Sequence, residues 1–131
     1  MTASLPEPSL PIVQVVCCDR RVRDGLCSVL GASARATVPD PIDDPSRALE
    51  IVGRDQPSAI VVDLAIAGGG DAPAFLAALR DQAPGARILV IGWNGESDGW
   101  VRSAGADGIL HVDGPAADLV DAIVPGWSAA G

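Results

Sequence analysis

The chain has 131 residues, which is enough for one domain with its own core and too few for two. Hydrophobic residues make up 48% of it and charged residues 20%, which indicates a globular protein. The formal net charge of -8 argues against nucleic acid as a direct partner, because contacts with phosphate need a basic face. No apolar run approaches the roughly 18 residues that a membrane-spanning helix requires, so we expect no membrane contact.

The first segment, residues 1–11, has neither the basic start nor the long apolar core of a signal peptide, and contains three prolines. We therefore expect a flexible lead-in. The chain has three cysteines, two of them adjacent, which cannot form a disulfide framework. That usage is typical of a reducing compartment and predicts a cytoplasmic protein.

The first half of the chain alternates between strand-like and helix-like patterns. The predicted elements are a strand over 12–17, an amphipathic helix over 19–30 that Asp19 caps and Gly31 ends, a weak strand over 35–38, and a helix that Asp44 or Ser46 caps. The run from Ser58 to Leu64 is apolar apart from Ser58 and Asp63. Such a run predicts a central strand of a parallel sheet, buried on both faces.

The second half repeats the alternation. The predicted elements are a helix over 72–81, a strand over 86–91, a short helix over 96–104, a strand over 109–112 and a helix over 116–124. Five strands alternating with helices predict a doubly wound α/β fold, with a parallel sheet covered by helices on both faces. Asp63, at the carboxyl end of the central strand, then lies where such sheets place ligands.

Several blocks resemble a response-regulator receiver domain of the CheY-like type. They are VVCCDRRVRDGLCSVL, PSAIVVDLAIAGG, RILVIG and AGADGILHVDGPAADLVDAI, of which the AGADG turn is the most specific. The resemblance covers residues 12–124 and leaves residues 125–131 as a C-terminal tail. It implies a flavodoxin-like (βα)5 fold whose five strands lie in the order 2-1-3-4-5.

The resemblance also assigns the positions of the family's phosphorylation site. Asp63 matches the phosphoacceptor aspartate. The two acidic residues that hold Mg²⁺ are matched by Cys17 and Cys18, with Asp19 one residue too late. Thiols are poor ligands for this hard cation.

Two further matches lack the family's functional groups. Gly92 stands at the position of the Thr or Ser that hydrogen-bonds the phosphoryl group, and Val112 at that of the Lys. Phosphoryl transfer depends on positioning and electrostatic stabilisation, and loss of one such donor costs roughly 3 kcal/mol. We therefore expect no phosphotransfer, no bound Mg²⁺, no other cofactor or metal, and no enzymatic activity. Asp63 is then expected to cap the following loop, or to contact a ligand in an altered site.

The adjacent cysteines have three readings. Two small buried side chains that replace unneeded charges are the favoured one. A metal site with His111 lacks a fourth ligand, and adjacent residues on a strand point to opposite sides. A redox role requires a thiolate of low pKa, whereas Asp63 would raise the pKa of a neighbouring thiol.

These observations predict an atypical receiver domain of a two-component system that signals without phosphorylation, by binding a protein partner or a second copy. The face that the resemblance implies combines the fourth helix, the fifth strand and the fifth helix, with Trp93, Trp100 and Trp127 as candidate contacts. Any effect on transcription would be indirect or would come from an output domain beyond residue 124. Two alternatives stay open: a sensor that holds a small molecule in the vacated pocket, and a residual phospho-switch through Asp63 and Asp19.

Overall fold

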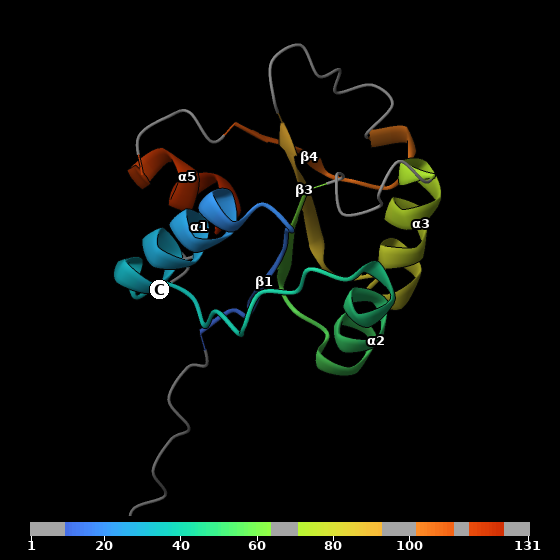
Figure 1. Cartoon of the computed structure of the whole chain (residues 1–131), viewed down its shortest axis with the longest axis horizontal. Coiled ribbons are helices and arrows are strands. Elements are labelled where there is room, and N and C mark those ends of the chain that lie inside the picture. Colours follow the sequence, from blue (N-terminus) through green and yellow to red (C-terminus); the bar gives the residue numbers. More distant parts are fainter. Residues whose placement is uncertain (1–9, 64–70, 93–101, 112–115, 125–131) are drawn as a thin grey trace, which may run out of the picture.

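The computed structural model describes residues 10–63, 71–92, 102–111 and 116–124 (Figure 1). Its centre is a parallel sheet of four strands in the order β1 (Val13–Val16), β2 (Ala59–Val62), β3 (Arg87–Gly92) and β4 (Gly108–His111). Every residue of β1 and β2 is buried, as two-sided coverage by helices requires. The α/β fold and the parallel sheet that the sequence predicts are confirmed.

The outer edge of β1 pairs with residues 37–42 at two isolated parallel bridges, Ile12 with Thr37 and Val16 with Ile42. The weak strand predicted over 35–38 is therefore reduced to a single bridge residue, Thr37. Pro39 and Pro41 lie between the two bridges, and proline has no N–H to donate to a sheet ladder. The segment occupies the side of β1 that the order 2-1-3-4-5 assigns to the second strand.

The helices form two layers, one on each face of the sheet (Figure 1). Helices α1 (Arg20–Ser33) and α5 (Ala116–Ile123) cover one face, and α2 (Pro45–Asp55) and α3 (Ala72–Gln82) cover the other. Each layer closes a separate core, because alternate residues of a strand point to opposite faces. Val13, Val15 and Cys17 belong to the α1/α5 core, whereas Val16 belongs to the α2/α3 core.

The helix ends confirm one sequence-based prediction and correct another. The Asp19 carboxylate caps α1 by accepting hydrogen bonds from the amides of Arg21 at 3.0 Å and Val22 at 3.3 Å. The helix does not end at Gly31 but continues to Ser33, and Ala34 closes it with a left-handed φ of 57°. In α2, Asp44 precedes the first residue, although its side chain makes no capping hydrogen bond.

Several predictions fall outside the described residues. They concern the lead-in to residue 9, the loop after Asp63, most of the helix over 96–104, the tail over 125–131, and Trp93, Trp100, Val112 and Trp127. Within the described part, no helix has the length and apolar character needed to cross a membrane.

Candidate functional site

Asp63 directly follows β2 and is held at the carboxyl edge of the sheet. Its amide donates a hydrogen bond of 2.8 Å to the carbonyl of Val16 in β1, and the residue is only 4% exposed. This is the edge at which open α/β sheets place ligands. The sequence-based position of Asp63 is therefore confirmed.

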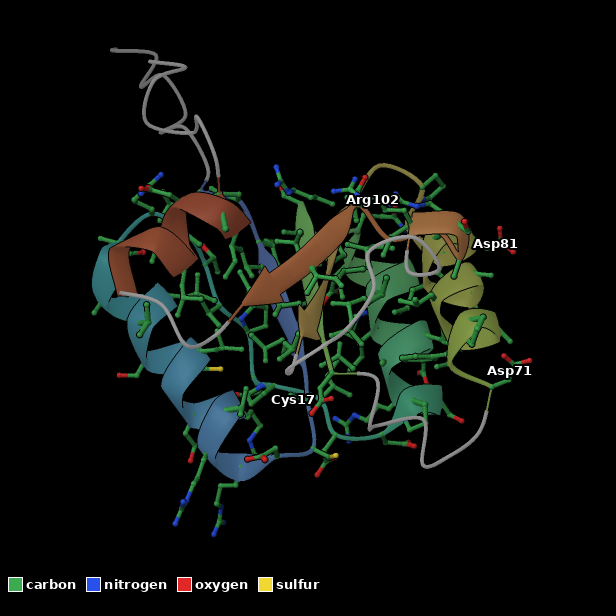
Figure 2. The ribbon with its side chains drawn as sticks, turned by 90° about the horizontal axis from the view of Figure 1, so that it is seen from above. Cys17, Asp71, Asp81 and Arg102 are labelled. Carbon is green, nitrogen blue, oxygen red and sulfur yellow. The ribbon has the colours of Figure 1, made fainter. Side chains whose placement is uncertain are left out.

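Cys17 occupies the same edge at the end of β1, with α1 on one side and α2 and α3 on the other (Figure 2). It is fully buried, and its amide donates to the Ile42 carbonyl at 2.9 Å. Its Sγ lies 3.7 Å from Oδ2 of Asp63, and the thiol also reaches the carbonyl of Asp19 at 3.5 Å. Where the resemblance places a metal-binding carboxylate, the structure thus places a thiol that donates to Asp63.

The environment of Cys17 keeps its thiol protonated. Burial, helped by the negative charge of Asp63, raises the pKa of Cys17 to about 12, while the backbone contact with Asp19 opposes the shift. Metal binding and redox chemistry both need the thiolate. At neutral pH the Cys17 thiol is therefore protonated and donates a hydrogen bond to Asp63.

Cys18 corrects the prediction that both cysteines are buried. Its side chain is exposed, because neighbouring residues at the end of a strand point to opposite sides. The carboxylate of Asp19 is exposed as well and is engaged in capping α1. The site therefore brings together Cys17 and Asp63, with Cys18 turned to solvent.

The other strands complete this edge. Gly92 is the last residue of β3, is buried, and lies in register with His111 of β4. With no side chain beyond hydrogen, Gly92 has no hydroxyl to offer at that position. Val112 falls just beyond the described part of β4.

Mg²⁺, which the resemblance implies for an ordinary receiver domain, does not fit the residues at this edge. The two matching ligands are a buried neutral thiol and an exposed thiol, whereas Mg²⁺ requires oxygen ligands in near-octahedral geometry. In the described part of the chain, no three His, Cys, Asp or Glu residues are grouped so that they could hold a metal ion.

One residue of interest is not among the candidates from the sequence. Gln14 is the single polar residue of β1, whose sequence is VQVV, and it is 1% exposed. It lines a cavity of about 360 Å³ between β1, residues 39–43 and α2. The signal was available in the sequence, since an amide in the middle of a buried strand needs hydrogen-bond partners.

No protein-family model and no curated protein matches the sequence, whereas several solved structures share this fold. The chain is similar to the signal receiver domain of the response regulator NarL from Mycobacterium tuberculosis, with 25% identity, a TM-score of 0.80, and coverage of 92% of this chain and 98% of that one.

Two further structures share the fold. A response regulator from Chloroflexus aurantiacus is 19% identical with a TM-score of 0.78, and coverage is 92% of this chain and 99% of that one. A response regulator from Burkholderia pseudomallei, solved with a phosphorylated aspartic acid and a calcium ion, is 23% identical with a TM-score of 0.71, over 92% and 70% of the two chains. The resemblance found in the sequence is thus confirmed: the chain has the fold of response-regulator receiver domains and is similar to them in structure.

Proposed function

We propose that this receiver domain signals without phosphorylation of Asp63, by binding a protein partner or a second copy of itself. The observation that carries the proposal is the contact of 3.7 Å between the Cys17 thiol and the Asp63 carboxylate. A buried thiol donor fills the place at which an acidic residue would hold the metal.

Phosphorylation of Asp63 would add negative charge beside the buried thiol of Cys17. The acyl phosphate brings further negative charge to a residue that is only 4% exposed. Stabilising that charge requires a metal, a cation or hydrogen-bond donors fixed in advance. Cys17 supplies one weak donor, and Gly92 supplies no side-chain donor.

The contact surface that we propose combines the segment before β4, β4 itself and α5, together with Trp93, Trp100 and Trp127. The formal net charge of the chain is -8, which favours a protein partner over nucleic acid. Aromatic residues are enriched in the buried centres of protein interfaces.

The test is a titration of the ¹⁵N-labelled protein with beryllofluoride, a mimic of the phosphoryl group, in the presence of 10 to 20 mM Mg²⁺. The amide spectrum is read at Asp63 and its neighbours, and a response regulator with an intact site serves as the positive control. We expect no saturable shift. A saturable shift that disappears in Asp63→Asn would show a working phospho-switch and overturn the proposal.

A complementary variant rebuilds the site with Cys17→Asp, Cys18→Asp, Gly92→Thr and Val112→Lys. It is expected to gain the beryllofluoride response that the natural chain lacks. Gain of response in this variant, with none in the natural chain, assigns the loss of phosphorylation to these positions.

A further inference from the structure

The side-chain amide of the buried residue Gln14 uses its Nε2 donor but not its Oε1 acceptor in hydrogen bonds with the described part of the chain. Its Nε2 donates to the carbonyls of Asp40 at 3.0 Å and Val15 at 3.2 Å. Its Oε1 accepts no hydrogen bond from the part of the chain that the structure describes. Among the described residues, the buried side-chain polar atom without a partner is Nε of Arg35, so Oε1 of Gln14 keeps contact with solvent and can accept a hydrogen bond from a molecule in the space beside it.

The cavity beside Gln14 can hold such a partner. Gln14 lies on the same face of β1 as Val16, and the volume of about 360 Å³ is enclosed by residues 39–43 on one side and by Ile51 and its neighbours in α2 on the other. This volume falls within the range of roughly 300–1,000 Å³ typical of small-molecule sites, near its lower end. A ligand of amino-acid size fits this space.

The charges around the cavity indicate the ligand's chemistry. Arg54 is paired with Asp55 at 2.8 Å and is already neutralised. Asp40, Asp43 and Arg47 also line the cavity, and none of them forms an ion pair with the described residues. Two carboxylates and one guanidinium complement a molecule that carries both an ammonium and a carboxylate group.

We propose that this cavity is a binding site for a small zwitterionic metabolite, a free α-amino acid. The ligand's carboxylate pairs with the guanidinium of Arg47, and its ammonium group lies toward Asp40 and Asp43. An N–H group of the ligand donates to Oε1 of Gln14. Ile51 and Ile42 contact the apolar part of the ligand.

The site is connected to the edge that carries Asp63, and this step rests on the proposed function. Ile42 lines the cavity, its amide donates to Val15 at 3.0 Å, and its carbonyl accepts from the Cys17 amide at 2.9 Å. Cys17 in turn contacts Asp63. A ligand that holds residues 39–43 against β1 and α2 therefore acts on the end of β1, where an ordinary receiver would respond to phosphate.

The experiment is a titration of the ¹⁵N-labelled full chain with each common L-amino acid up to about 10 mM, a range in which dissociation constants in the millimolar range are detected. The side-chain NH₂ signals of Gln14 and the backbone amides of residues 39–43 report on the cavity. We expect saturable shifts at these signals with at least one amino acid. The N-acetyl amide of that amino acid, which lacks both charges, is expected to bind at least tenfold more weakly.

Three variants separate the site from general effects. Arg47→Ala removes an exposed guanidinium without touching the core and is expected to weaken binding at least tenfold. Gln14→Leu removes the acceptor and is expected to weaken binding as well. Arg21→Ala, an equally exposed arginine at the start of α1, is the matched control and should bind as the natural chain does.

Two outcomes would overturn the site. One is a folded protein whose cavity signals do not shift with any of the amino acids. The other is binding that Arg47→Ala leaves unchanged. Neither outcome bears on phosphorylation, because the beryllofluoride titration is read at Asp63 and not at the cavity.

Discussion

Replacing Cys17 by aspartate would place a second carboxylate against Asp63, at the position where the resemblance implies an acidic residue. The Cys17 Sγ lies 3.7 Å from Oδ2 of Asp63, and the two residues are 0% and 4% exposed. The new carboxylate would therefore approach Asp63 to about 4 Å, in a place that water hardly reaches.

The expected penalty follows from Coulomb's law. Two like charges about 4 Å apart repel by about 4 kcal/mol at an effective dielectric constant near 20. Because a typical domain unfolds with a free energy of only about 5–15 kcal/mol, the variant should lose a large part of its stability at pH 7.5. Cys17→Ser, which is similar in size and uncharged, is the matched control and should lose about 1–2 kcal/mol.

The loss should depend on pH with a definite sign. Repulsion and burial raise the pKa of the introduced carboxyl in the folded state above its value in the unfolded chain. The folded variant therefore holds a proton that the unfolded chain has released. The destabilisation is full above the raised pKa and fades as the pH falls toward the ordinary aspartate range.

The assay is urea unfolding followed by circular dichroism, at pH 7.5 and pH 5, with and without Mg²⁺. We expect Cys17→Asp to be less stable than Cys17→Ser at pH 7.5, with a smaller difference at pH 5. Mg²⁺ should restore part of the loss in the aspartate variant, since it supplies a countercharge for two oxygen ligands. Equal stability of the two variants at pH 7.5 would refute the close, buried contact on which the proposed function depends.

The other predictions concern thiol chemistry and the support of the sheet. A thiol reagent at pH 8 should modify the exposed Cys18 quickly and Cys17 only on unfolding, as peptide mapping would show. Because folding raises the pKa of Cys17 from 9.0 to about 12, the free energy of unfolding should fall as the pH rises through that interval, and it should fall less in Cys17→Ala. Arg80→Met removes hydrogen bonds to three backbone carbonyls and a carboxylate, and should lower the free energy of unfolding in urea by about 2–3 kcal/mol. An unchanged unfolding midpoint would show that these hydrogen bonds do not stabilise the fold. Gly105→Ala should destabilise the fold by about 1–2 kcal/mol, because φ at this residue is +116° and a Cβ would lie 3.4 Å from Arg80. Gly25→Ala should stabilise it by up to about 1 kcal/mol, because Gly25 lies within α1 and a Cβ there would meet nothing within 4 Å. The same sign for both changes would refute the argument.

Much of the fold could be predicted from local patterns. Apolar runs such as 59–62 and helical repeats such as that of α1 are periodic within one segment, so the order of strands and helices follows from the sequence alone. The position of Asp63 at a strand end follows from the same pattern. The end of α1 was harder to predict, since Ala34 adopts the left-handed conformation that glycine normally provides.

The contacts of the site could be predicted only in part. The resemblance in the sequence predicts that Cys17 and Cys18 stand at the positions of two acidic residues, and strand geometry predicts that adjacent residues point to opposite sides. Which of the two thiols faces Asp63 depends on the register between β1 and β2, and register is a pairing of segments far apart in the chain.

The cavity beside Gln14 belongs wholly to the tertiary structure. The sequence shows one amide in an apolar strand, but the walls come from residues 39–43 and from α2. Two prolines interrupt the pairing of that outer segment with β1, so it makes two bridges with β1 in place of a continuous ladder. Local periodicity therefore determined which segments become strands and helices, whereas packing between distant segments decided which side chains meet and where space remains between them.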